Sequence, residues 1–265
     1  GEQGFLCPTV PEEYGGVGVD FRYNCIVNEE IGHAGCTGLG WTLHSDIAVP
    51  YIVRYGSEEQ KQRFLPRCVS GELITAIAMT EPSAGSDLQG TKTTAVLDGD
   101  EWVLNGSKTF ITNGMSADLI CVVAKTDPAA GGKGISLIMV ETPGCEGFSR
   151  GRNLEKLGQK SQDTSELFFD NVKVPAENLL GAAEGRGFIQ LMEQLPQERV
   201  IIAAGACATM EKALKLTADY VKERKAFGKR ILDFQNTQFK LAERFTEAKI
   251  ARIFVDDCAM KLAEG

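Results

Sequence analysis

The hydrophobic periodicity of this chain changes twice along its length, and the order of the three resulting segments limits the folds that it can adopt. Residues 20–71 show the three-to-four spacing of apolar side chains that is typical of amphipathic helices. From Leu73 to Pro175 the pattern becomes short β-prone runs that are separated by turn residues. Beyond Gly187, strong helix formers return with helical spacing. This order predicts an α+β fold and lacks the βαβ alternation of doubly wound parallel sheets.

The C-terminal region has its own boundary signals. Because proline is tolerated in the first turn of a helix but not inside one, we expect a long helix to begin near Pro196 and to end near Lys225. The Phe227-Gly228 pair then turns the chain, and a second long helix is expected from about Asp233. The sequence therefore predicts a helical bundle after the strands.

Three dipeptides in the middle segment are hairpin signals: Asp-Gly at 98–99, Asn-Gly at 105–106 and Asn-Gly at 113–114. They predict a mainly antiparallel sheet. The predicted domains are an N-terminal helical domain at 1–73, a middle β-domain at 74–178 and a C-terminal helical bundle at 179–265.

Charge and composition restrict the class of protein. The 265 residues are 43% hydrophobic, which is enough to bury a core, and the net charge of −8 provides no field that would attract nucleic acid. The longest uncharged run of the helical C-terminal region, residues 200–210, is shorter than the roughly 20 residues of a membrane span. We expect a soluble protein, and because the chain starts at Gly1 and closes within a helical pattern, we expect the intact protein to extend beyond both ends.

Metal and disulfide sites are not expected. The eight cysteines are scattered without a C-x-x-C pair, which favours reduced and mostly buried thiols. His33 and His44 stand in an apolar, glycine-rich region without a ligand pattern, so we expect them to have packing roles. The glycine motifs of Rossmann and P-loop nucleotide sites are also absent.

The segment AMTEPSAGSDLQG, residues 78–90, is the strongest candidate for a binding loop. A β-prone run leads there into small residues whose backbone N–H groups and hydroxyls could face a phosphate. Most strings rich in Pro, Gly, Ser and Asp are ordinary turns, and the residues alone favour that interpretation.

The same segment resembles the A-M-T-E-P-x-A-G-S-D-x-x-G signature of the acyl-CoA dehydrogenase family. Three further strings are similar to that family in the same order: NGSKTFITNG at 105–114, FFDNVKVPAENLLG at 168–181 and RKAFGKRILDFQNTQFKLAE at 224–243. The resemblance covers essentially the whole chain. It implies a helical domain, a β-domain and a C-terminal four-helix bundle, with FAD as cofactor and a homo-oligomer, usually a tetramer.

The resemblance assigns cofactor contacts in the middle segment. The residues concerned are Ile77, Met79, Thr80, Ser86, Phe110, Ile111 and Thr112. The first three line the flavin ring, Ser86 reaches both the FAD pyrophosphate and the thioester, and the Phe-Ile-Thr run stacks near and hydrogen-bonds the isoalloxazine. Family members often have tyrosine at position 77 and tryptophan at 110, so this chain lacks one polar contact and some stacking area.

A second set of cofactor contacts, Arg224, Phe227 and Gln235, matches family positions that reach the FAD of a neighbouring subunit. Basic residues here could instead complement the dipole at a helix C-terminus, and we favour that role for the lysines of this segment. For Arg224 we favour the cofactor, because a guanidinium suits a pyrophosphate. Flavin binding would then require an oligomer.

The resemblance points to Glu198 as the catalytic base that removes the substrate's α-proton. The family takes this base either from a late glutamate beyond residue 265 or from this position, where Glu198 precedes Arg199 and Arg199 lies 25 residues before Arg224. Gln197 and Arg199, with Ser86, are the expected substrate contacts. In a first helical turn the dipole would stabilise the carboxylate, whereas the apolar residues that follow would keep water sparse. These two effects act on the pKa of the carboxyl group in opposite directions. A solvated first-turn acid is the alternative.

The implied reaction is FAD-dependent α,β-dehydrogenation of an acyl-CoA to a trans-2-enoyl-CoA. LPQER at 195–199 and QDTSELFF at 162–169 resemble the long-chain branch of the family. The alternatives are an isovaleryl or other branched-chain dehydrogenase, a flavin oxidase or monooxygenase on the same scaffold, and a non-catalytic assembly partner. The family implies electron-transferring flavoprotein as acceptor, and a bacterial cytoplasm or a mitochondrial matrix as location.

Overall fold

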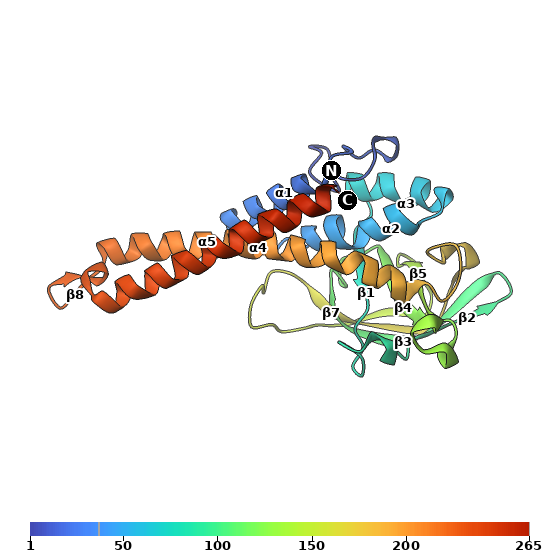
Figure 1. Cartoon of the computed structure of the whole chain (residues 1–265). Coiled ribbons are helices and arrows are strands. Elements are labelled where there is room, and N and C mark those ends of the chain that lie inside the picture. The colour runs from blue at the N-terminus through green and yellow to red at the C-terminus, as the bar shows by residue number, and fades with distance from the viewer. Residues whose placement is uncertain (37, 265) are drawn as a thin grey trace. The chain divides into compact units, whose positions relative to one another are not determined.

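A computed structural model describes residues 1–36 and 38–264 of the chain (Figure 1). Within it the chain forms two compact units. Unit 1 contains Gly1–Val19 and Gly38–Pro196, and unit 2 contains Asp20–Thr37 and Gln197–Gly265. The predicted α+β class is confirmed, with helices before and after a β-sheet.

The helices of unit 1 that precede the sheet lie in the predicted helical range 20–71, except for the first short turn. They are the 3₁₀ turn η1 (Glu12–Tyr14), the π-helix η2 (Leu43–Ala48), α2 (Val49–Tyr55) and α3 (Glu58–Ser70). α3 begins at a capping box, in which the Ser57 side chain accepts from the Gln60 N–H and the Gln60 side chain accepts from the Ser57 N–H. Gly71 ends α3 in the left-handed conformation.

The sheet of unit 1 has seven strands in the order β1-β4-β2-β3-β7-β6, with β5 paired to β4. Its strands are β1 (Thr75–Ala78), β2 (Thr94–Asp98), β3 (Glu101–Thr112), β4 (Leu119–Lys125), β5 (Ile135–Glu141), β6 (Phe148–Asn153) and β7 (Thr164–Pro175). β4 pairs in parallel with β1 and β2, and the other pairs are antiparallel, so the mainly antiparallel prediction is confirmed. Both faces of β4 are buried, because its alternate residues join two separate core clusters.

Two of the three predicted hairpins are wrong. Asp98 and Gly99 do join β2 to β3. Gly106 lies inside β3, where an added Cβ would come within 2.4 Å of Thr93 Oγ1, so glycine serves close packing at this point and not a turn. Asn113 (φ 61°) does end β3 in a turn, but the next strand, β4, does not pair with β3.

The sequence pattern also missed β6. Its residues, FSRGRN, are half-buried or exposed, and β6 lies at the edge of the sheet. Such a strand shows no apolar alternation, which is the signal on which strand prediction depends.

Unit 2 is helical. It contains α1 (Phe21–Ala34), most of α4 (Gly187–Glu223), a short hairpin of β8 (Lys225–Ala226) and β9 (Lys229–Arg230), the 3₁₀ turn η6 (Ile231–Asp233) and α5 (Gln235–Glu264). α4 and α5 run side by side, with β8 at their shared end (Figure 1). The predicted turn is confirmed, because Phe227 and Gly228 both have positive φ, as a two-residue hairpin turn requires. One apolar cluster joins α1, α4 and α5.

The predicted start of the long helix at Pro196 is wrong. α4 begins at Gly187 and continues through Pro196, which lies at the boundary of the two units. A proline inside a helix removes one hydrogen bond and costs roughly 3 kcal/mol, so packing must hold the helix on both sides. Leu191 before the proline and Ile201 after it are both buried. The sequence rule for proline therefore failed because tertiary packing outweighs it.

The two histidines have different environments. His44 is buried: its Nδ1 accepts from the Thr75 N–H at 3.0 Å and its Nε2 donates to the Cys68 carbonyl at 3.0 Å, which confirms a packing role. His33 is exposed and pairs with Glu211 at 3.1 Å, so the packing prediction is wrong for it. Among the described residues no group of three or more His, Cys, Asp or Glu could hold a metal ion.

We expect the stability of unit 1 to fall in mild acid because of His44. Burial lowers the pKa of His44 below its ordinary value of 6.5, outweighing the carbonyl of Cys68. The unfolded chain therefore takes up a proton as the pH drops below about 6.5 while the native state stays neutral, and the free energy of unfolding decreases until the pH reaches the native pKa. Urea unfolding between about pH 7.5 and 5.5 measures this, followed by the fluorescence of Trp41 and Trp102, both in unit 1.

His44→Gln should flatten this pH dependence, whereas His33→Gln should leave the decrease in place. A wild-type protein with the same free energy of unfolding at both ends of the range would contradict the assignment.

Candidate functional site

The end of β1 lies beside the second half of β3, although the two strands are not ladder partners. The Thr109 N–H donates to the Thr80 carbonyl at 2.9 Å, and Lys108 Nζ donates to the Met79 carbonyl at 3.1 Å. The Asn113 side chain donates to the Thr75 carbonyl at 3.2 Å. The structure thus brings the Met79-Thr80 pair next to the Phe-Ile-Thr run that the sequence singled out.

Phe110 is the most unusual residue of this site. It has φ 58°, a left-handed conformation that costs a non-glycine residue about 1–2 kcal/mol. Its side chain is 66% exposed, while its neighbours Thr109 and Ile111 are buried. The irregular pairing of β3 with β7 between Lys108 and Ile111 allows this inversion. An aromatic ring is therefore held outward at the edge of the site.

Ile77 and Ile111 differ from the other predicted cofactor contacts, because their side chains belong to the two core clusters of unit 1. Ile77 is 7% exposed and Ile111 is 2% exposed. Ile111 can therefore offer a ligand little more than its backbone, and Ile77 offers a small apolar surface.

The loop after β1 is closed at its base by a buried carboxylate. Glu81 accepts from the N–H groups of Lys92 at 2.7 Å and Thr93 at 3.0 Å, and from Lys108 Nζ at 2.8 Å. These contacts hold the two ends of the loop together and leave Ser86 exposed between them.

Glu81 and Lys108 are both ionised at neutral pH. Burial acts to raise the pKa of Glu81, but the donors from Lys108 and Thr93 outweigh it and lower that pKa. Burial lowers the pKa of Lys108 to about 8, against the opposite effect of Glu81. Neither residue was predicted from the sequence, where the available signal was a lysine in a strand-forming run that is otherwise uncharged, GSKTFIT.

The exposed groups of the site fit a flavin nucleotide. Within residues 1–36 and 38–264, the side-chain hydroxyls of Thr80, Ser86 and Thr112 have no hydrogen-bond partner. Together with these hydroxyls, the outward ring of Phe110 offers an aromatic face beside free polar groups. That combination suits a planar ring system with a polar edge and an attached phosphate.

Glu198 lies in unit 2 on the buried face of α4. It is 8% exposed and follows the buried Gln194 by one turn, with the buried Ile201 on the same face. Gln197 is half-buried and Arg199 is exposed.

The prediction that Glu198 stands in a first helical turn is wrong. It lies about three turns after the start of α4 at Gly187, and the helix dipole acts only within the first turn. The stabilisation by the helix dipole that was expected from the sequence is therefore absent at Glu198. The burial of Glu198 and its position inside α4 exclude the alternative of a solvated first-turn acid.

The second set of predicted cofactor contacts lies together at the far end of unit 2. Arg224 follows α4, Phe227 occupies the hairpin turn and Gln235 begins α5, and all three are exposed. Phe227 is 95% exposed and meets Phe234 edge to face, with 6.3 Å between the ring centroids. The structure thus groups three exposed side chains around one hairpin.

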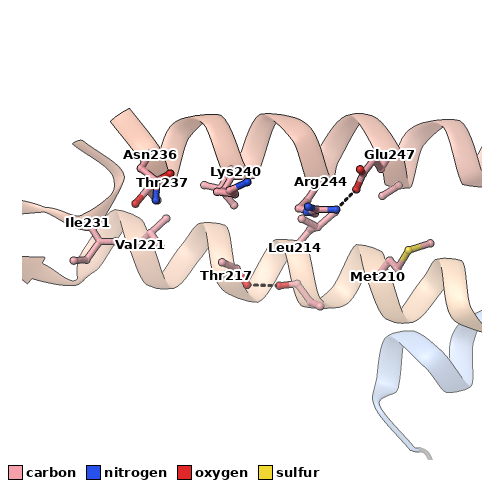
Figure 2. A pocket seen from close by; sticks show the side chains of 13 residues that line it. Met210, Leu214, Thr217, Val221, Ile231, Asn236, Thr237, Lys240, Arg244 and Glu247 are labelled. Atoms are coloured by element: carbon pink, nitrogen blue, oxygen red, sulfur yellow. Dashed lines mark hydrogen bonds and ion pairs between the residues drawn. The ribbon is translucent and has the colours of Figure 1, made fainter. Parts of the chain in front are cut away.

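A groove lies between α4 and α5 of unit 2, and no predicted site residue lines it (Figure 2). Apolar side chains from both helices, such as Leu214 and Leu241, form its lining together with Lys240 and Arg244. Figure 2 shows the Arg244–Glu247 ion pair at its rim.

Comparison with known proteins agrees with these features. The N-terminal, middle and C-terminal domain models of acyl-CoA dehydrogenases match residues 1–72, 76–172 and 185–265. The crystal structure of an acyl-CoA dehydrogenase from Geobacillus kaustophilus superimposes with a TM-score of 0.96 at 56% identity, covering 100% of this chain and 70% of that one. This chain belongs to the acyl-CoA dehydrogenase family. That family consists of FAD-dependent oxidoreductases.

Relatives from two branches of the acyl-CoA dehydrogenase family match over nearly the whole chain. The mitochondrial long-chain specific acyl-CoA dehydrogenase of Sus scrofa is 52% identical over 260 residues, which are 97% of this chain and 60% of the pig protein. The mitochondrial isovaleryl-CoA dehydrogenase of Solanum tuberosum is 42% identical over 258 residues, 97% of this chain and 62% of the potato protein. The chain thus spans about three fifths of the length of these relatives.

None of the helices in residues 1–36 and 38–264 has the length and the apolar composition that a transmembrane segment requires.

Proposed function

We propose that the protein to which this chain belongs is an FAD-dependent acyl-CoA dehydrogenase that converts long-chain acyl-CoA thioesters to trans-2-enoyl-CoA. The observation that carries the proposal is the outward-facing Phe110 beside the Met79-Thr80 pair that follows β1, at a site bordered by free hydroxyls. FAD, when bound, would accept the hydride that leaves the β-carbon.

In unit 1, Phe110 would stack near the flavin ring, with Ile77 and Met79 as apolar neighbours. Thr80 and Thr112 would hydrogen-bond its polar edge, Ile111 would contribute backbone, and Ser86 would reach the pyrophosphate and the thioester. These roles fit the observed exposure of Phe110 and Ser86. The residues named for this role are Ile77, Met79, Thr80, Ser86, Phe110, Ile111 and Thr112.

In unit 2, the proposed base is Glu198. Its carboxylate would take the α-proton, and its burial keeps bulk water from competing for that proton. Gln197 and Arg199 would position the thioester from the same helix. Arg224, Phe227 and Gln235 would contact the FAD of a neighbouring subunit, so cofactor binding would require a homo-oligomer, which we propose is a tetramer.

The acyl chain length is the finer part of the proposal. Its support is the higher identity to the long-chain relative, 52% against 42% for the isovaleryl relative. A branched short-chain substrate is the second candidate, because that relative also matches 97% of the chain. We further propose electron-transferring flavoprotein as the electron acceptor.

An anaerobic titration of the full-length protein with acyl-CoA thioesters tests the function. Isovaleryl-CoA and straight chains from about four to sixteen carbons are added in turn, and the bleaching of the oxidised flavin absorbance is followed. We expect the strongest bleaching with the long chains. Strongest bleaching with isovaleryl-CoA would show that the substrate is a branched short-chain acyl-CoA and not a long-chain one. No bleaching with any thioester would overturn the proposed activity.

A further inference from the structure

The buried ion pair between Lys108 and Glu81 lies directly behind the backbone that the proposed flavin contacts use. Lys108 Nζ bonds both Glu81 Oε1 at 2.8 Å and the Met79 carbonyl at 3.1 Å. The side chains of Lys108 and Glu81 are 0% and 3% exposed. Neither side chain can reach a ligand in solvent, so any role in the site must act through the backbone between them.

These contacts determine how the Met79-Thr80 peptide is oriented. In a planar trans peptide the C=O and the following N–H point in opposite directions, and the described chain has no cis peptide bond. Because the Met79 carbonyl points to Lys108, the Thr80 N–H points away from the ammonium. The Thr80 carbonyl is fixed in turn by the Thr109 N–H at 2.9 Å. The Thr80 N–H has no backbone acceptor among the described residues and is available to a ligand.

The hydrogen bond from Lys108 Nζ to the Met79 carbonyl also makes the Thr80 N–H a stronger donor. An ammonium bound to a carbonyl oxygen withdraws electron density from the amide, and hydrogen bonds that share a peptide group strengthen one another in a low dielectric. Lys108 is held charged by the Glu81 carboxylate, which two backbone N–H groups also bind. A buried charge without such partners would be unstable.

We infer that Lys108 and Glu81 are positioning residues that aim and polarise the Thr80 N–H toward the ring of the bound flavin. The inference rests on the proposed flavin function. Reduction places negative charge on the polar edge of the flavin ring, so a polarised donor there stabilises the reduced form more than the oxidised form. The ion pair would then raise both the affinity for FAD and the reduction potential of the flavin.

The test uses the full-length holoenzyme. Lys108→Met and Glu81→Gln each leave one buried charge unpaired and are expected to lose stability, so the decisive variant combines the two changes, which remove both charges at similar volume. We expect the double variant to bind FAD about tenfold or more weakly, because a hydrogen bond assisted by a charge is lost. We also expect its flavin reduction potential to be more negative than that of the wild type.

Glu141→Gln is the matched control. Glu141 also holds basic side chains, Arg63 and Arg67, and its ion pairs join α3 to β5. The Glu141→Gln variant should have a lower melting temperature than the wild type and an unchanged FAD affinity and reduction potential. A double variant with wild-type affinity and potential, or one that cannot fold, would overturn the inference. A wild-type protein that does not bind FAD would instead refute the proposed function.

Discussion

Glu198→Gln should abolish flavin bleaching by acyl-CoA while the variant still binds FAD. The amide keeps the shape of the side chain but cannot accept the α-proton, and a positioned general base contributes about 10²- to 10⁴-fold to such a step. We therefore expect the rate of anaerobic flavin reduction to fall by about 10³-fold. Stopped-flow absorbance under saturating thioester measures that rate, and the visible spectrum reports whether the flavin remains bound.

Glu193→Gln is the matched control for this experiment. Glu193 belongs to the same helix, is exposed, and bonds Tyr55 and Arg54. Its loss should leave the rate of reduction within about twofold of the wild type, because surface ion pairs contribute little. Normal bleaching in Glu198→Gln would transfer the role of base to another carboxylate of the intact protein.

The order of elements could be predicted from the sequence because periodicity reports burial, and burial governs most of this fold. β4 was recognisable because residues 119–124 are all buried. The sequence predictions fail where tertiary packing or the position of a strand in the sheet determines the structure. Pro196 is held within α4 by packing on both sides, and β6 has no apolar alternation because it lies at an edge.

The candidate site was predictable only in part. The loop of residues 78–90 and the Phe-Ile-Thr run were found through their resemblance to a family, and the structure places them side by side. The left-handed backbone of Phe110 could not be predicted, because a phenylalanine in a strand pattern gives no sign of positive φ. Lys108 was missed because a lysine is rarely fully buried, and its partner Glu81 lies 27 residues away.

Arg252→Met is expected to destabilise unit 2 by several kcal/mol. Arg252 is 13% exposed and forms ion pairs with Glu29 of α1, Glu211 of α4 and Asp256 of α5. Burial acts to lower the pKa of Arg252, but Glu29 and Asp256 outweigh this and raise it above the usual range. Without the guanidinium three carboxylates would repel one another, and a hydrogen bond to a charged group contributes about 1.5–3 kcal/mol, less where the partner is exposed as Glu211 and Asp256 are. Far-UV circular dichroism during urea unfolding measures the loss, because unit 2 is mostly helical.

Two further variants separate a network effect from a simple loss of charge on α5. Lys261 pairs with Asp257 four residues earlier on the same helix and is 71% exposed, so Lys261→Met should leave the free energy of unfolding nearly unchanged. Adding Glu29→Gln to Arg252→Met removes one uncompensated carboxylate and should restore part of the lost stability, a coupling that a double-mutant cycle measures. If Arg252→Met costs as little as Lys261→Met, the four charges do not hold α1 against α4 and α5. Apolar contacts such as Phe21 with Ile201 and Val255 would then account for the packing of these helices.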